Sequence, residues 1–383
     1  MKPFRIVLSA VSLLAVFQFS AAAQSHPLPR RVNIVLIVAD GLAADDLSCY
    51  GQTQFQTPHL DELAAGGVRF TNYFAGSVAG EPARAALMTG KNVSPLPDAE
   101  ISLTPHDLTI AEILKNSGYN TFLAGEWNLG DENSAGAPWR QGFNEFAGYF
   151  DAWDAQNSFP DYLWKYDVTF SLAENQSKVF NGREMIYDNT GGRKQEYVPD
   201  AFFQWTFNYA QNHKPDQFNH HRPFFITLDE TIPGNGDHAV PTDAPFSEES
   251  WPQAEKNRAA GIARLDNDIG KLLIDLKDAG VSSNTVIFFT SDTVPKKGGG
   301  IDPNFFQENS GSDDLRVPLI VYWPGAVPAG EVSGAPCSAR DVLPTVAAFA
   351  LVQPPKKING TSLVPLILGQ QARRGSTNNA IQK

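Results

Sequence analysis

The chain has 383 residues, a formal net charge of −12 at pH 7 and 42% hydrophobic residues. Its length suits one large domain or two modest ones, and its acidity argues against nucleic acid or another polyanion as the main partner. Cys49 and Cys337 could pair in an oxidising compartment or serve as small buried apolar residues, and the sequence leaves both readings open.

The first 23 residues have the features of an export signal. Lys2 and Arg5 give a basic start, residues 6–19 form an apolar run, and a small-residue cleavage site lies near Ala23. The apolar run is too short to span a membrane, and no later stretch is suited to do so. We therefore expect a secreted or periplasmic protein without a membrane span, whose charge after loss of Lys2 and Arg5 is about −14.

Strand-like and helix-like segments then alternate along most of the chain. Residues 32–38 form an unbroken run rich in β-branched side chains, which is typical of a strand buried on both faces. Thr57 and Pro58 predict the start of a helix that runs to residue 65, because threonine caps helices and proline suits the first turn. Further strands are expected at 68–74, 119–124, 224–228, 286–290 and 317–322, and further helices at 82–88, 107–116 and 262–276.

This alternation predicts an α/β fold with a mostly parallel central sheet and helices on both faces. We expect residues 32–368 to form the domain and the polar residues 369–383 to form a disordered tail. Residues 131–200 show little periodicity and are interpreted as a long surface excursion. Residues 293–315 form a Gly- and Asp-containing loop between two strands, a position where sites are often built in α/β sheets.

Short motifs from residue 32 to about 368 resemble the sulfatase family within the alkaline-phosphatase-like superfamily. They lie at 33–40, 49–51, 57–64, 67–72, 82–90, 114–119, 142–146, 289–292, 316–321, 323–325, 341–345 and 359–363. Each is weak alone, but their joint order and spacing carry the resemblance. It implies the sulfatase fold and, as the activity of the family, hydrolysis of sulfuric esters.

In that family an aldehyde hydrate, formed from a Cys or Ser side chain, cleaves the ester. A calcium ion held by Asp and Asn oxygens polarises the sulfate, while lysines, an arginine and histidines neutralise charge and protonate the leaving oxygen. The resemblance places the nucleophile on Gly80, which has no β-carbon to oxidise, and the motif arginine on Arg84.

Most other reactive positions of the family are also changed. The calcium positions fall on Asp40 and Asp292, which are weak remnants, and on Gly41 and Thr293, where the ligand is lost. The lysine position falls on Glu126, and two histidine positions fall on Asn128 and Gly234. A late lysine position falls near Gln307, with Lys296 and Lys297 as alternatives. A like-charge pair about 4 Å apart costs on the order of 4 kcal/mol at an effective dielectric of about 20, so the glutamate opposes sulfate binding.

Several polar side chains have both a functional and a structural interpretation. Asp40 and Asp292 either retain calcium or hold turns after strands, and Arg84 either binds an anion or pairs with a carboxylate such as Glu81, Glu126 or Asp40. The favoured interpretations are structural for the others: a surface turn for Asp45 and Asp46 with Asp46 as a cap, solvated histidines for His220 and His221, and structural hydroxyls for Ser77 and Thr89.

We therefore expect a secreted sulfatase-like pseudoenzyme that acts by binding or regulation, with no cofactor unless its residual site still binds calcium. The alternative is an active sulfuric or phosphoric ester hydrolase with a rebuilt metal site. Sulfatases continue past the 359–363 motif into a smaller C-terminal sheet subdomain, whereas this chain ends about 20 residues later. We expect the face that this subdomain would cover to be available to a protein partner, which the sequence does not name.

Overall fold

The computed structural model describes residues 31–77, 79–93, 101–171, 176–234, 239–295 and 316–370. The expected export signal, Lys296, Lys297, Gln307 and all but the first two residues of the expected tail lie outside these ranges. None of the described helices combines the length and the apolar character that a membrane crossing requires.

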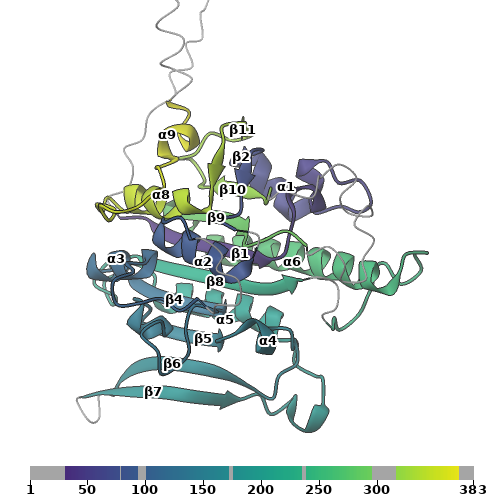
Figure 1. The fold of residues 1–383 in the computed structure, drawn as a ribbon, viewed down its shortest axis with the longest axis horizontal. Helices are drawn as coiled ribbons and strands as arrows, with labels where there is room; N and C mark the ends of the chain where they lie inside the picture. Colours follow the sequence, from purple (N-terminus) through teal and green to yellow (C-terminus); the bar gives the residue numbers. More distant parts are fainter. Residues whose placement is uncertain are drawn as a thin grey trace, which may run out of the picture.

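One large sheet runs through the molecule (Figure 1). In spatial order its described strands are β11 (Glu331–Ser333), β2 (Val68–Phe70), β10 (Leu319–Tyr322), β9 (Thr285–Ser291), β1 (Asn33–Asp40), β8 (Phe224–Pro233), β4 (Asn120–Glu126), β5 (Glu145–Tyr149), β6 (Tyr162–Ser171) and β7 (Gln176–Met185). A separate parallel pair joins β3 (Tyr73–Phe74) to β12 (Cys337–Ser338).

The middle of the sheet is parallel and its sides are antiparallel. Strands β9, β1, β8, β4 and β5 run in the same direction, while β10 and β6 run against their neighbours at the two sides. The predicted parallel sheet is confirmed for this middle part, and the sheet as a whole is mixed. Parallel strands need helical crossovers, which bury both faces, and the interior of β1 is accordingly inaccessible to solvent.

Helices cover both faces of the sheet, as the alternation predicted. The described helices are α1 (Pro58–Ala65), α2 (Gly80–Thr89), α3 (Ile110–Asn116), α4 (Ala152–Ala155), α5 (Val198–Asn212), α6 (Gln253–Asp278), α8 (Val342–Phe349) and α9 (Val364–Ile367). Short 3₁₀ turns are η1 (Ala44–Asp46), η2 (Ser48–Tyr50), η3 (Pro138–Arg140), η4 (Thr190–Gly192), η5 (Ser282–Asn284) and η6 (Ala339–Asp341).

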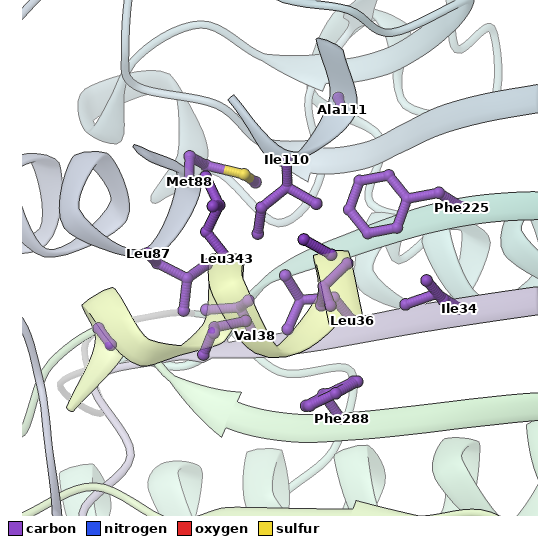
Figure 2. Close-up of a cluster of buried hydrophobic side chains, with 14 of the residues drawn as sticks. Ile34, Leu36, Val38, Leu87, Met88, Ile110, Ala111, Phe225, Phe288 and Leu343 are labelled. Carbon is purple, nitrogen blue, oxygen red and sulfur yellow. The ribbon is translucent and has the colours of Figure 1, made fainter. Parts of the chain in front are cut away.

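The side-chain alternation of β1 divides the core into two layers. Ile34, Leu36 and Val38 point to the face covered by α2, α3 and α8, where Figure 2 shows Leu343 of α8 among them. The intervening side chains of β1 point to the face covered by α1, α5 and α6. Because both faces of β1 are packed, a shift of the strand along its neighbours would move its apolar side chains out of place. The carboxyl end of β1 is therefore held between β8 and β9.

Residues 131–200 do not form the surface excursion that the sequence suggested. Strands β5, β6 and β7 extend the central sheet, and α5 begins at Val198 and packs on β8 and β4. The aromatic residues that obscured the periodicity form the contacts of this extension, since Trp139 stacks on Tyr166 of β6 with ring centroids 4.8 Å apart. This interpretation of the region was therefore wrong.

The two cysteines do not pair with each other. Cys49 lies in η2 and Cys337 in β12, and both are free thiols. Burial raises the pKa of each thiol to about 12, so both are uncharged at neutral pH. The structure thus favours the interpretation of both as small, largely apolar side chains.

Glu145, the first residue of β5, gives a prediction about the pH dependence of stability. Burial, with a smaller contribution from Asp167, raises its pKa to about 7, and its Oε1 lies 3.5 Å from Nε2 of His213. A carboxyl whose pKa is higher in the folded state than in the unfolded state stabilises the fold less as pH rises, here between about 4.5 and 7. We expect Glu145→Gln to raise the free energy of unfolding by about 2–3 kcal/mol at pH 8 and to leave it unchanged near pH 4. Urea unfolding at the two pH values measures this, and an equal effect at both would contradict the assignment.

A candidate site at the carboxyl ends of the parallel strands

Four carboxylates converge where the parallel strands end. Asp40 is the last residue of β1, Glu126 is the last residue of β4, and Asp292 directly follows β9. Asp229 lies in β8, in register with Gly125 of β4. The carboxyl ends of parallel strands share one edge of a sheet, so these side chains meet although up to 252 residues separate them along the chain.

Arg84, in the second turn of α2, lies among these carboxylates. Its Nη1 donates to Oε1 of Glu126 at 2.5 Å, and its Nε donates to Oδ1 of Asp229 at 3.3 Å. Its Nη2 lies 3.1 Å from Oδ2 of Asp292, as an ion pair without hydrogen-bond alignment. The arginine and these three partners are each less than 5% exposed. Of the two interpretations of Arg84, pairing with carboxylates is the one observed.

Asp292 has its oxygens engaged on several sides. The backbone N–H of Gly41 and the hydroxyl of Thr293 each donate to its Oδ1 at 3.0 Å. Gly41 and Thr293 are the two positions where calcium ligands were expected to be lost, and here they bond the remaining aspartate instead. Together with the ion pair to Arg84, these contacts hold the Asp292 carboxylate in place at the end of β9.

Asp40 is the carboxylate with the fewest contacts. Among the described residues, none donates a hydrogen bond to its side chain or forms an ion pair with it at 4 Å or less. Burial, followed by the charges of Asp292 and Glu126, raises its pKa well above the usual range. Its side chain lines the cavity described below, so it is the acidic group that a bound molecule would meet.

The pKa values of the other buried groups are set by burial and by their attraction to the single guanidinium of Arg84. Burial raises the pKa of Glu126 and of Asp229 although Arg84 opposes the shift in both. Burial alone would lower the pKa of Arg84, but Asp229, Glu126, Asp292 and Asp40 together raise it above its usual range. The guanidinium is therefore permanently charged and shared among more acidic groups than it can neutralise.

A cavity of about 260 Å³ opens above this cluster. Gly80 begins α2 at its wall, where a β-carbon would lie 3.0 Å from Oδ2 of Asp292 and 3.5 Å from Nη1 of Arg84. Position 80 thus points at the acidic cluster, as the resemblance implied for a nucleophile, but it carries no side chain. Among the described residues that line the cavity, Arg84 is the only cation.

Two further positions from the family pattern lie at or near the cavity. Asn128 lines it and has a left-handed backbone with φ of 52°. Gly234 lies behind Gly41, and its N–H donates to the carbonyl of Asp40 at 3.0 Å. Neither carries the imidazole that would protonate a leaving oxygen.

The expectation of a surface turn at Asp45 and Asp46 was wrong for Asp46. Its side chain caps the turn by accepting from the N–H of Ala43 at 2.8 Å, but it is fully buried in an ion pair with Arg258 of α6. Arg258 also donates to the carbonyls of Gly41 and Gly234, so this pair supports the loop under Asp40.

The other candidate residues stay outside the cluster. His220 and His221 are exposed in the loop before β8, at the opposite end of that strand. Ser77 accepts from the N–H of Ala79 at 3.5 Å, and Thr89 donates to the carbonyl of Ala85 at 2.6 Å. Both hydroxyls thus make local contacts, in agreement with their structural interpretation.

Asp229 was not predicted as a site residue. A signal was present in the sequence, because Asp229 and Glu230 are the two charged residues of the fully buried strand β8. Its placement follows from β4, where Gly125 has φ of 109° and a β-carbon would approach the carbonyl oxygen of Asp229 to 1.8 Å. Glycine at 125 lets the two strands approach, and this brings the carboxylates of Asp229 and Glu126 to one guanidinium.

The comparisons with known proteins agree with this architecture. A family model described as Sulfatase matches residues 32–351. The chain belongs to the sulfatase family. Human N-acetylgalactosamine-6-sulfatase is 30% identical over 378 residues, which cover 89% of the chain and 66% of that protein. Human arylsulfatase A is also 30% identical, over 91% of the chain and 70% of that protein. This sulfatase-family chain thus spans about two thirds of the length of these relatives.

Solved structures show the same fold. The crystal structure of Ps i-CgsB aligns with a TM-score of 0.71 at 26% identity, over 88% of this chain and 76% of that one. A second structure of that protein, in complex with k-i-k-neocarrahexaose, aligns equally well at 25% identity. The sulfatase fold inferred from the motifs is confirmed.

The calcium ion of the family does not fit the residues at this site. No group of three His, Cys, Asp or Glu side chains within the described ranges is arranged to hold a metal. The reason is visible in the residues: Gly41 and Thr293, where the resemblance placed two further calcium ligands, supply no carboxylate, so only Asp40 and Asp292 remain of the expected acidic ligands. No chemical step is therefore assigned to a metal here.

Proposed function

We propose that this sulfatase-family protein is an exported pseudoenzyme that binds its ligand without hydrolysing a sulfate ester. The proposal rests on two neighbouring positions, Gly80 and Arg84. At the nucleophile position there is no atom to oxidise, and the neighbouring space holds a guanidinium bound to three carboxylates. A reaction that begins with an aldehyde hydrate cannot start from this arrangement.

The excess of acidic groups at the cavity supports binding of a ligand other than sulfate. Asp40, Glu126, Asp229 and Asp292 surround one arginine, and Glu81 adds a further acid at the cavity wall. One like-charge contact near 4 Å costs on the order of 4 kcal/mol, which equals the whole binding free energy of a millimolar ligand. We infer that the cavity selects a neutral or cationic group.

The class of ligand is proposed from the relatives. N-acetylgalactosamine-6-sulfatase is named for a sulfated amino sugar, and the Ps i-CgsB complex contains an oligosaccharide. A cavity of about 260 Å³ that favours uncharged or cationic groups suits an unsulfated part of a saccharide. The protein would then recognise a carbohydrate of the kind its relatives act on, at a position that lacks the sulfate.

Turnover assays separate this proposal from an active hydrolase with a rebuilt site. Purified protein is incubated with aryl sulfates and aryl phosphates in the presence of Ca²⁺, Mg²⁺ or Mn²⁺. We expect no rate above that of the uncatalysed reaction. A rate that is lost in Asp40→Ala but kept in Glu81→Gln would establish an active site built on Asp40 and overturn the proposal.

A further inference from the structure

We propose that a second cavity, at the amino end of β5, is a binding site for a protonated organic amine. The cavity has a volume of about 240 Å³ and is lined by α5 and by the strands β4, β5, β6 and β7, on the side of the sheet that ends in β7 (Figure 1). Phe122 in its wall precedes Glu126 by four residues of β4, which is about 13 Å along the strand. The site is therefore separate from the one on which the proposed function rests.

Aromatic side chains form much of the wall. Tyr209 of α5 stacks on Phe122 with ring centroids 4.7 Å apart, and His213, which directly follows α5, stacks on Tyr209 at 3.9 Å. Trp205 and Tyr166 add further aromatic surface. Aromatic rings attract organic cations, because the face of the ring carries partial negative charge. The wall thus suits a ligand with both an apolar body and a positive charge.

Carboxylates outnumber cations in this wall. Glu145 of β5, Asp167 of β6 and Glu184 of β7 all line the cavity, while Lys165 is the one lysine or arginine among the described lining residues. Its Nζ lies 2.8 Å from Oε2 of Glu184. In the described part of the chain, no lysine or arginine forms an ion pair with Glu145 or Asp167. Three carboxylates thus face one ammonium group that is already paired, and the cavity favours a cation.

The wall also lacks hydrogen-bond donors beside Glu145. Nδ1 of His213 lies 3.1 Å from the carbonyl oxygen of Tyr209, which can only accept, so Nδ1 carries the proton of the neutral ring. Burial lowers the pKa of His213, which keeps the ring neutral at and above neutral pH. Its Nε2 is then an acceptor, and it lies 3.5 Å from Oε1 of Glu145, a second acceptor. A protonated amine brings three N–H donors to such a place.

The hydroxyl of Tyr209 is a further buried group without a partner. The side chain is 4% exposed, and its hydroxyl forms no hydrogen bond to the described residues. Apart from burial, the charges of Glu145 and Asp167 raise its pKa most, so the hydroxyl lies toward these two carboxylates. A buried hydroxyl without a hydrogen bond is costly, and a ligand among these groups would satisfy it.

Calorimetric titration of the full-length protein at pH 7.5, in phosphate buffer that contains no amine, tests the site. The probes are benzylamine, benzyl alcohol as its uncharged counterpart, glucosamine and N-acetylglucosamine. We expect benzylamine to bind with a Kd in the millimolar range or tighter, and benzyl alcohol to bind at least about 10-fold more weakly. Whichever of benzylamine and glucosamine binds more tightly shows whether a simple amine or an amino sugar is the source of the ammonium group.

Variants of the wall locate the binding. Glu145→Gln and Asp167→Asn should each weaken benzylamine binding by about 10-fold or more, and Tyr209→Phe by about 2- to 10-fold. Glu145→Gln is expected to stabilise the fold above neutral pH, so its loss of binding would not reflect unfolding. The control is Asp161→Asn, which removes an exposed carboxylate directly before β6 that does not line the cavity, and it should leave the Kd unchanged.

The pH dependence gives a second readout. Benzylamine stays protonated from pH 5.5 to 7.5, whereas Glu145, with a pKa of about 7, becomes protonated as pH falls. The charged groups that face Glu145 are Lys165, Asp167 and Glu184, with His213 gaining its proton at low pH. We expect binding about 10-fold weaker at pH 5.5, and most of this change should be absent in Glu145→Gln.

Two results would overturn the proposal. Equal affinities for benzylamine and benzyl alcohol would show an apolar groove that does not recognise the charge. Amine binding that persists in Glu145→Gln and Asp167→Asn but is lost in Asp40→Asn would place the amine in the other cavity. Turnover of an aryl sulfate, which would contradict the proposed function, leaves this inference untouched, since no residue of the amine site takes part in that proposal.

Discussion

Arg84→Met is expected to lower the free energy of unfolding by about 3–5 kcal/mol at neutral pH in the absence of divalent ions. The guanidinium is 3% exposed and contacts Glu126, Asp229 and Asp292, which would keep their charges in a buried environment with no counter-ion. Removal of one partner of a buried ion pair is costly for this reason, unlike replacement of the whole pair by apolar side chains. Chemical unfolding in EDTA measures the loss.

The loss should shrink as pH falls. Burial raises the pKa values of Glu126 and Asp229, and without Arg84 to oppose the shift these values rise further. Protonation then removes the uncompensated charges, so the variant recovers stability relative to the unmodified protein as pH falls below the raised pKa values. Arg264→Met is the matched control, because its ion pair with Asp200 is about one third exposed and should contribute only about 0–1 kcal/mol. A similar loss in both variants would contradict the special role of the cluster.

Glu126→Lys is expected to give the protein an affinity for sulfate that it otherwise lacks. The change removes a negative charge and adds a positive one at the position where the family has lysine. Arg84 would keep Asp229 and Asp292, and the new ammonium group could pair with Asp40, which has no such partner among the described residues. Removing one like-charge repulsion of about 4 kcal/mol predicts a gain in sulfate affinity of at least about 100-fold.

Two related variants make this result interpretable. Glu126→Gln removes only the negative charge, so its affinity for sulfate should lie between those of the unmodified protein and Glu126→Lys. Glu81→Lys changes the charge at the cavity wall by the same amount, but Glu81 is more accessible to solvent, which screens it. Isothermal titration with sodium sulfate compares the four proteins. Equal gains for Glu126→Lys and Glu81→Lys would show that net charge alone matters.

Much of the fold was predictable because it depends on local patterns. The run at 32–38, apolar except for Asn33 and rich in β-branched residues, predicted a strand buried on both faces, and β1 occupies the middle of the sheet with its interior inaccessible. Thr57 and Pro58 marked the start of α1 at the correct residue. The region 131–200 was misread because aromatic and glycine residues on an antiparallel extension do not alternate cleanly between polar and apolar.

The candidate site was predictable where the family motifs placed a residue, and not where distant segments meet. Gly80, Arg84 and Glu126 were identified from motifs, and the structure brings them to one cavity. Asp229 belongs to no motif and reaches the cluster through the register of β8 against β4. The pair between Asp46 and Arg258 joins residues 212 positions apart, a contact that no local pattern reveals.

Metal analysis of the purified protein tests the central claim most directly, because only Asp40 and Asp292 remain of the acidic ligands expected at the family's calcium positions. Elemental analysis by mass spectrometry after exchange into metal-free buffer, and again after exposure to Ca²⁺, gives the number of ions per chain. We predict far less than one bound ion in both cases. One tightly held calcium per chain that disappears in Asp40→Ala would contradict the account, because the family's metal site would then be intact.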